Sequence, residues 1–174
     1  MGLSKETKNI EVSKSEDERI LNLVQIELFS LANKDDLVKA LQMLKQYPEM
    51  KIVVDDFKAH EEELRKTIYE GEIARRIEQD DLHADKTANA VILARNQIKA
   101  AEECDMIKKT IERAVGIIRD QESREVIYLR YLKGYSYRET MLFMKRGVKS
   151  ATMDRRLSSG VASVANTLKM WNVI

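Results

Sequence analysis

The chain has 174 residues, of which 34% are charged, and it contains one proline and six glycines. This composition favours long helices over a sheet-rich fold, and the length suits one or two domains. The single cysteine, Cys104, excludes an internal disulfide. The two histidines, His60 and His83, lie far apart in the sequence, so neither a metal site nor a cofactor is expected.

The charge of the chain is unevenly distributed, although the formal net charge is only +1. Residues 120–174 contain ten basic and five acidic residues, whereas residues 1–119 contain 20 basic and 24 acidic ones. A basic end on a mildly acidic body is typical of a polyanion-binding module attached to another region. No signal peptide follows Met1, and no apolar stretch approaches the ~20 residues that span a bilayer. We therefore expect a cytoplasmic protein without membrane contact.

The first third of the chain predicts a tail and two helices. Residues 1–14 are polar and aperiodic, which indicates a mobile tail. Residues 15–18 fit a capping box that begins a helix ending near Leu31. Asn33 is expected to cap a short second helix, which Pro48 is expected to end. The apolar faces of these two helices are Ile20, Leu23, Val24, Leu28 and Leu31, and Leu37, Ala40, Leu41 and Leu44.

Two longer helices are predicted next. Residues 50–79 have a helical pattern in which Gly71 marks a candidate break, and residues 84–119 read as one long helix. The expected buried positions of the first are Ile52, Val53, Phe57, Leu64, Ile68 and Ile73. Those of the second are Val91, Ala94, Ile98 and Ala101, then Ile107, Ile111, Ala114 and Ile118. Three sustained heptads are missing, so packing against the preceding helices or against a partner subunit explains the pattern as well as a coiled coil.

The last 55 residues predict three helices with two short breaks. A helix over residues 122–133 is expected to stop at Gly134, and Ser136 is expected to cap a helix over residues 137–145. The final helix is predicted over residues 150–169. Its expected inward face is Met153, Leu157, Gly160 or Val161, Val164 and Leu168. Such an arrangement is typical of a helix-turn-helix DNA-binding unit.

The opposite side of the last helix supplies the candidate DNA-binding residues. They are Lys145, Arg146, Lys149, Ser150, Thr152, Arg155, Arg156 and Ser159. Arg155 and Arg156 suit base-edge or phosphate contacts, while the basic turn before them suits phosphates. Lys149 occupies the capping position, where Ser150 can take over the cap. Asp154 is unfavourable beside DNA unless it pairs with an arginine or accepts from a cytosine amino group.

The C-terminal segments Val126–Tyr137 and Thr152–Leu157 resemble the promoter-binding, region-four-like domain of bacterial sigma factors. Together with Val161–Leu168 they resemble the ArpU/RinA-like phage transcriptional regulators. The resemblance implies an all-α fold in which a helical N-terminal region and a long helix lead into a sigma-like helix-turn-helix. It further implies an activator of late, packaging or lysis genes that recruits or positions RNA polymerase.

Three functional classes follow from these patterns. The leading expectation is a sequence-specific regulator of double-stranded DNA, with residues 120–174 as the DNA-binding domain. Residues 15–119 would then serve oligomerisation, a dimer being favoured, or partner binding. The alternatives are a helical adaptor or antirepressor that binds a protein partner, and a DNA-packaging subunit like the small terminase. An enzyme is not expected, because no paired carboxylates in a loop, glycine-rich phosphate cradle or nucleophile–histidine set is present.

Overall fold

The computed structural model describes residues 31–77, 81–144 and 148–174, without the side chains of residues 75–77 and 81–86. This part of the chain is entirely helical and contains no strand, which confirms the expected all-α fold. The expected tail and the expected first helix up to residue 30 lie outside the described residues. Leu31, expected at the end of that helix and on its apolar face, is not helical and is 78% accessible. None of the described helices combines the length and the apolar composition needed to cross a membrane.

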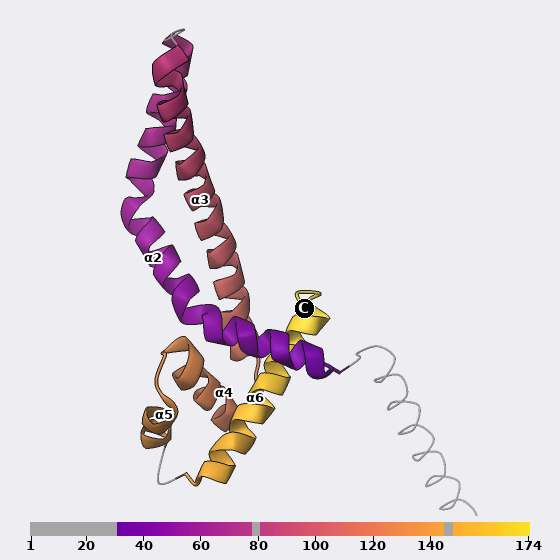
Figure 1. The fold of residues 1–174 in the computed structure, drawn as a ribbon. Helices are drawn as coiled ribbons and strands as arrows, with labels where there is room; N and C mark the ends of the chain where they lie inside the picture. Colours follow the sequence, from indigo (N-terminus) through magenta and orange to yellow (C-terminus); the bar gives the residue numbers. More distant parts are fainter. Residues whose placement is uncertain (1–30, 78–80, 145–147) are drawn as a thin grey trace, which may run out of the picture.

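The helices fall into a long arm and a compact C-terminal group (Figure 1). In chain order the elements are α2 (Lys34–Ile77), α3 (Asp81–Gly116), α4 (Gln121–Ile127), the π-helical turn η1 (Tyr128–Leu132), α5 (Tyr137–Phe143) and α6 (Ser150–Met170). The part of α2 beyond Pro48 and the antiparallel α3 form the arm. The remaining helices gather at its base, where α6 lies against the first turns of α2.

The start of α2 is capped as expected, but its predicted end at Pro48 is wrong. Asn33 Oδ1 accepts the N–H of Asp36 at 2.8 Å, and Asp36 Oδ2 accepts the N–H of Asn33 at 2.9 Å. The helix then continues through Pro48 to Ile77. A proline inside a helix removes one hydrogen bond and bends the axis, and burial on both sides, at Leu44 and Val54, holds the flanking turns helical. Figure 1 shows that α2 changes direction along its length.

The apolar stripes predicted for the long helix α3 are confirmed. Ala94 and Ala101 are buried in the upper stripe, and Ile111, Ala114 and Ile118 are buried in the lower one. The upper stripe packs against α2, and the lower stripe enters the core at the base of the arm. The apolar stripes of α3 therefore pack, over most of the length of the helix, against α2 of the same chain.

Gly71 does not break the helix, contrary to expectation, because it lies at a close approach of α2 and α3. The residue is buried inside α2. A Cβ atom built on it would lie 2.2 Å from Cγ2 of Val91 and 3.4 Å from Cγ2 of Thr87. The absence of a side chain is thus what allows the two helix backbones to approach each other here.

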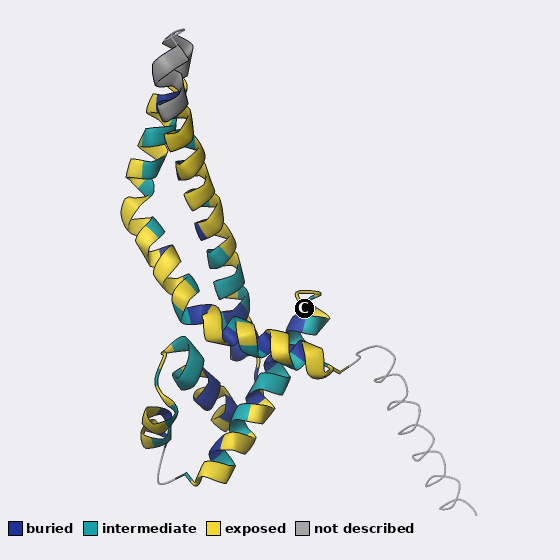
Figure 2. Ribbon diagram, viewed as in Figure 1, coloured by how far each residue is buried: buried dark blue, intermediate teal, exposed yellow. Residues whose placement is uncertain are grey.

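Three positions predicted to be buried in α2 are exposed instead. Ile52, Val53 and Ile73 have 68%, 42% and 36% of their surface accessible, whereas Val54, which was not predicted, is only 1% accessible. The reason is geometric: a two-helix arm covers only one face of each helix, and on α2 that face includes Val54. The arm consequently keeps apolar side chains on its surface. Figure 2 shows that many residues of the arm are exposed.

The core lies at the base of the arm, where four helices meet (Figure 2). Its buried members are Ala40, Leu44, Tyr47, Ile111, Ala114, Val115, Ile118, Ile127, Val164, Ala165 and Leu168. They come from α2, α3, α4 and α6, so the core spans the expected domain boundary between residues 119 and 120. The chain's single tryptophan, Trp171, packs against this core, and the guanidinium of Arg113 lies 5.2 Å from its ring centroid.

Polar contacts fasten α6 to the start of α2 beside this core. Lys169 Nζ lies 2.8 Å from Asp36 Oδ2, and the backbone N–H of Ala32 donates to Asn166 Oδ1 at 2.7 Å. The hydrogen bond from Lys169 holds the pKa of the Asp36 carboxyl below its usual range. The same carboxylate therefore caps α2 and binds α6.

We predict that Gly71→Ala destabilises the protein by about 1–3 kcal/mol, because the added methyl overpacks the contact with the stiff side chain of Val91. Urea unfolding followed by circular dichroism measures the loss. Gly116→Ala is the matched control, since a Cβ there meets nothing within 4 Å. Equal stabilities of the two variants would contradict the close-approach role.

Candidate nucleic-acid interface

The C-terminal group of helices begins with α4, whose cap joins the exposed Asp120 to the buried Ser123. Asp120 accepts the backbone N–H of Ser123 at 3.0 Å and also accepts its hydroxyl, and Ser123 is 1% accessible. These bonds hold the pKa of the Asp120 carboxyl below its usual range. The break predicted at residues 120–123 is therefore a tightly bonded helix start, which orients α4 relative to α3.

The stop and the cap predicted between the first two C-terminal helices are both confirmed. Gly134 has a φ of +77°, which only glycine adopts readily, and Arg130 donates to the carbonyl of Tyr135 at 2.8 Å. Ser136 and Glu139 form a complete capping box at the start of α5. The hydrogen bonds to Ser136 lower the pKa of the Glu139 carboxyl. Gly134, Arg130, Ser136 and Glu139 thus define the direction in which the chain enters α5.

The inward face of α6 follows the predicted stripe. Met153, Val164 and Leu168 are completely buried. Gly160 lies so close to α4 that a Cβ on it would be 2.4 Å from Cγ1 of Ile127 and 3.2 Å from the carbonyl oxygen of Ser123. The crossing of α6 over α4 therefore depends on a residue without a side chain, as well as on apolar burial.

The predicted DNA-binding residues differ in how exposed they are. Lys149, Ser150, Arg155 and Ser159 are exposed along the first turns of α6, and Thr152 is partly buried. Lys145 and Arg146 lie outside the described residues. We call the side formed by Lys149, Ser150, Thr152, Arg155 and Ser159 the reader face.

Arg156 differs from its neighbour Arg155 in this respect. Its guanidinium forms an ion pair with Glu122 at the start of α4, and only 13% of its side chain is accessible. Its Nε is buried without a hydrogen-bond partner among the described residues. Arg156 therefore connects α6 to α4, whereas Arg155 remains directed to the outside.

In the described part of the chain, no side chain caps the first turn of α6. Lys149 occupies the capping position without a side-chain hydrogen bond. Ser150 does not take over the cap, because its Oγ lies 3.0 Å from the hydroxyl of Tyr137. No side chain of the described residues therefore occupies the first backbone N–H groups of α6, where the helix dipole favours negative charge.

Among the described residues, Asp154 is bonded to Tyr137 and not to an arginine, which was the protein partner expected for it. The hydroxyl of Tyr137 donates to Asp154 Oδ1 at 2.9 Å, so the start of α5 is bonded to the first turns of α6. Tyr137, together with Glu122, was not recognised from the sequence. The unfavourable carboxylate of Asp154 on an otherwise basic helix was the signal that a donor had to lie nearby.

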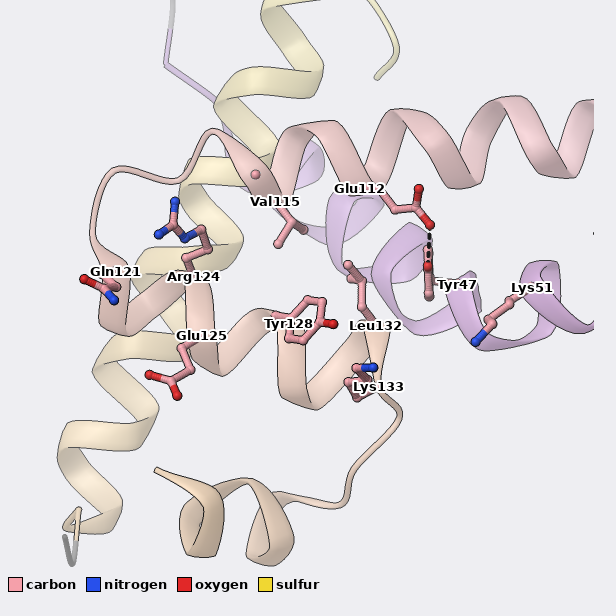
Figure 3. A pocket seen from close by; sticks show the side chains of 11 residues that line it. Tyr47, Lys51, Glu112, Val115, Gln121, Arg124, Glu125, Tyr128, Leu132 and Lys133 are labelled. Carbon is pink, nitrogen blue, oxygen red and sulfur yellow. Dashed lines mark hydrogen bonds between the residues drawn. The ribbon is translucent and has the colours of Figure 1, made fainter. Parts of the chain in front are cut away.

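An open groove of about 610 Å³ separates the base of the arm from α4 and η1 (Figure 3). Its basic residues Lys51, Arg124 and Lys133 come from different elements and do not converge on one point (Figure 3). On its wall, the hydroxyl of Tyr47 donates to Glu112 Oε1 at 2.6 Å. Burial and this carboxylate raise the pKa of Tyr47. The pair joins α2 to α3, which is a structural role.

Comparisons of the chain with models of protein families, with curated proteins and with solved structures find no match. The functional interpretation therefore depends on the residues and their geometry.

We predict that Gly160→Ala destabilises the protein by about 1–3 kcal/mol through overpacking against Ile127. Combining it with Ile127→Ala should cost less than the sum of the two single changes, because the removed side chain makes room for the methyl. Urea unfolding of the four proteins measures this coupling. Ser158→Ala, an exposed neighbour, is the control. If the losses in the free energy of unfolding were additive, a methyl group at position 160 would not collide with the side chain of Ile127.

We also predict a specific acid sensitivity. The capping carboxyls of Asp120 and Glu139 have folded-state pKa values below the 3.8 and 4.5 of the free side chains. Their contribution to stability is complete above the unfolded pKa and is lost as the pH falls through the folded pKa. The free energy of unfolding, measured with urea, should therefore decrease as the pH falls below about 4. Asp120→Asn together with Glu139→Gln should flatten this decrease, and an unchanged slope would contradict the assignment.

Proposed function

We propose that the chain is a sequence-specific, double-stranded DNA-binding transcriptional regulator in which α6 reads the major groove. One observation carries the proposal: α6 has a buried inner face and, on the opposite side of its first turns, the basic and hydroxyl-bearing reader face. The major groove is about 12 Å wide and admits one helix. In a helix-turn-helix, the N-terminal residues of the second helix contact the base edges.

The local geometry supports contacts with both bases and phosphates. Arg155 is exposed and can bridge two acceptors of a guanine. Lys149 and the uncapped N–H groups of the first turn are suited to phosphate oxygens. The bond from Tyr137 turns the Asp154 carboxylate toward α5, which reduces its repulsion of the DNA backbone.

The sequence resemblance extends this proposal to a phage-type activator of late or packaging genes that recruits RNA polymerase. The arm supports such a role, because it leaves a large surface free for other contacts while α6 engages DNA at the other end of the molecule (Figure 1). On this proposal Arg155 contacts DNA and Arg156 maintains the orientation of the reader.

We predict that Arg155→Ala weakens binding to a DNA site selected from random duplexes by roughly 5- to 150-fold, the loss of one bidentate base contact. Lys149→Ala should weaken binding to all sequences and reduce the slope of log K against log salt by about 0.9. Fluorescence anisotropy at several salt concentrations measures both effects. Unfolding curves of each variant exclude a change in stability.

Arg95→Ala is the matched control, because this exposed arginine lies on the arm and pairs with Glu72. It should bind DNA like the unmodified chain. If Arg155→Ala and Arg95→Ala bind equally well, α6 is not the reading element.

A helical adaptor is the second candidate function, and the surface of α5 favours it. Leu142 and Phe143 are 83% and 56% accessible, and Phe143 lies 4.7 Å from the ring of Tyr135. Large apolar side chains that are exposed next to each other often form the contact surface for another protein. An adaptor would show little salt-dependent DNA affinity, whereas a DNA-binding regulator shows a steep dependence.

A further inference from the structure

Two rows of side chains on the arm remain uncovered after α2 and α3 have packed together. They are Val53, Phe57, His60 and Leu64 on α2, and Leu93, Gln97 and Ala100 on α3. All except Leu93 line an open hollow of about 390 Å³ between the two helices. Leu93 precedes Gln97 by four residues and so extends the same row toward the tip of the arm. We call this surface the arm trough.

The arm trough leaves apolar surface in contact with water. Val53 and Leu93 are 42% and 60% accessible, and Phe57 and Leu64 are partly buried. A helix with apolar residues on more than one face normally packs against more than one neighbour. Among the described residues, each helix of the arm has only one neighbour along this stretch, so the trough resembles one half of a helical bundle.

We propose that the arm trough packs against the arm trough of a second copy of this chain, so that two arms form a four-helix bundle. The inference rests on the proposed function only for the direction of pairing. From Val53 to the level of Gly71, which contacts Val91 beside Leu93, the face is about 27 Å long and about 20 Å wide, or roughly 1,100 Å² over both copies. This area exceeds the ~1,000 Å² that a specific interface requires.

The charges of the arm are compatible with a second copy. Arg65 pairs with Glu61 at 2.8 Å, Lys66 with Glu70 at 3.6 Å and Lys99 with Glu103 at 3.9 Å. Because these pairs are satisfied within each arm, their charges neither oppose self-association nor demand an oppositely charged partner. Two carboxylates, Asp56 and Glu63, also line the hollow. Both are exposed, and Asp56 lies 3.4 Å from His60 Nδ1, so these groups can stay in contact with water when two arms pair. The polar members His60 and Gln97 interrupt the apolar rows, as polar residues that select one register do in coiled coils.

The two arms pair in parallel, about a two-fold axis along their length. From Pro48 to Ile77 the arm extends about 45 Å. Antiparallel pairing would place the two reader faces at opposite ends of the bundle, where they could not reach one duplex. Parallel pairing places both readers at the same end, as half-sites about 34 Å apart require. In this arrangement Val53 faces Val53 of the second copy.

Charge substitutions in the trough test the interface and its direction. We expect sedimentation equilibrium without DNA to give a dimer of the full chain. Val53→Glu and Val53→Lys should each raise the dimer dissociation constant by about tenfold or more, because like charges then meet at the axis. An equal mixture of the two variants should recover the dimer. Both substitutions are at an exposed position, so circular dichroism should show an unchanged helix content.

Met106→Glu is the matched control, since Met106 is 64% accessible and lies on the side of α3 away from the trough. It should leave the dimer intact. A monomeric full chain, or dissociation by Met106→Glu equal to that by Val53→Glu, would overturn the proposal. Recovery by mixing Val53→Glu with Leu93→Lys, and not with Val53→Lys, would overturn the parallel direction. Because these measurements contain no DNA, their failure is independent of whether Arg155 binds bases.

Discussion

The close contact between α6 and the helices beneath it is the constraint on which the rest of the structure depends. Gly160 lets α6 approach Ile127 of α4, and Val164 and Leu168 continue into the core formed with α2 and α3. One uninterrupted helix of 21 residues therefore has two halves with different surroundings. Its second half is held by burial, and that burial fixes where the exposed first half points.

Several polar residues of the C-terminal helices hold neighbouring segments in place by hydrogen bonds or ion pairs. Arg130 holds the turn at Gly134, Arg156 pairs with Glu122, and Tyr137 connects α5 to α6. Basic residues here thus divide into those that orient helices and those that face outward. The excess of positive charge in this region consequently overstates the number of basic side chains that could contact DNA.

Much of the fold was predictable because its signals are local. Asn33 and Ser136 cap helices as their side chains predict, Gly134 stops one, and the stripe of α6 identifies its buried face. The errors at Pro48 and Gly71 have a common physical origin. Both residues weaken an isolated helix, but packing of the flanking turns against other helices keeps α2 continuous.

The candidate site was predictable to the level of its helix but not of each side chain. Arg155 and Arg156 are indistinguishable in sequence, since both occupy the same turn of α6. Only the position of Glu122, 34 residues earlier in the chain, separates them. The exposure of Val53 and Ile73 was equally hidden, because periodicity identifies apolar faces without giving the number of neighbours.

Trp171 gives the molecule a built-in optical reporter. It is the only indole in the chain, it follows directly after α6, and it lies between the core and the guanidinium of Arg113 on α3. Its emission therefore reports on one event, the seating of α6 against the arm. The arm and the exposed first turns of α6 contain no second tryptophan, so the emission comes from one known position and needs no added label.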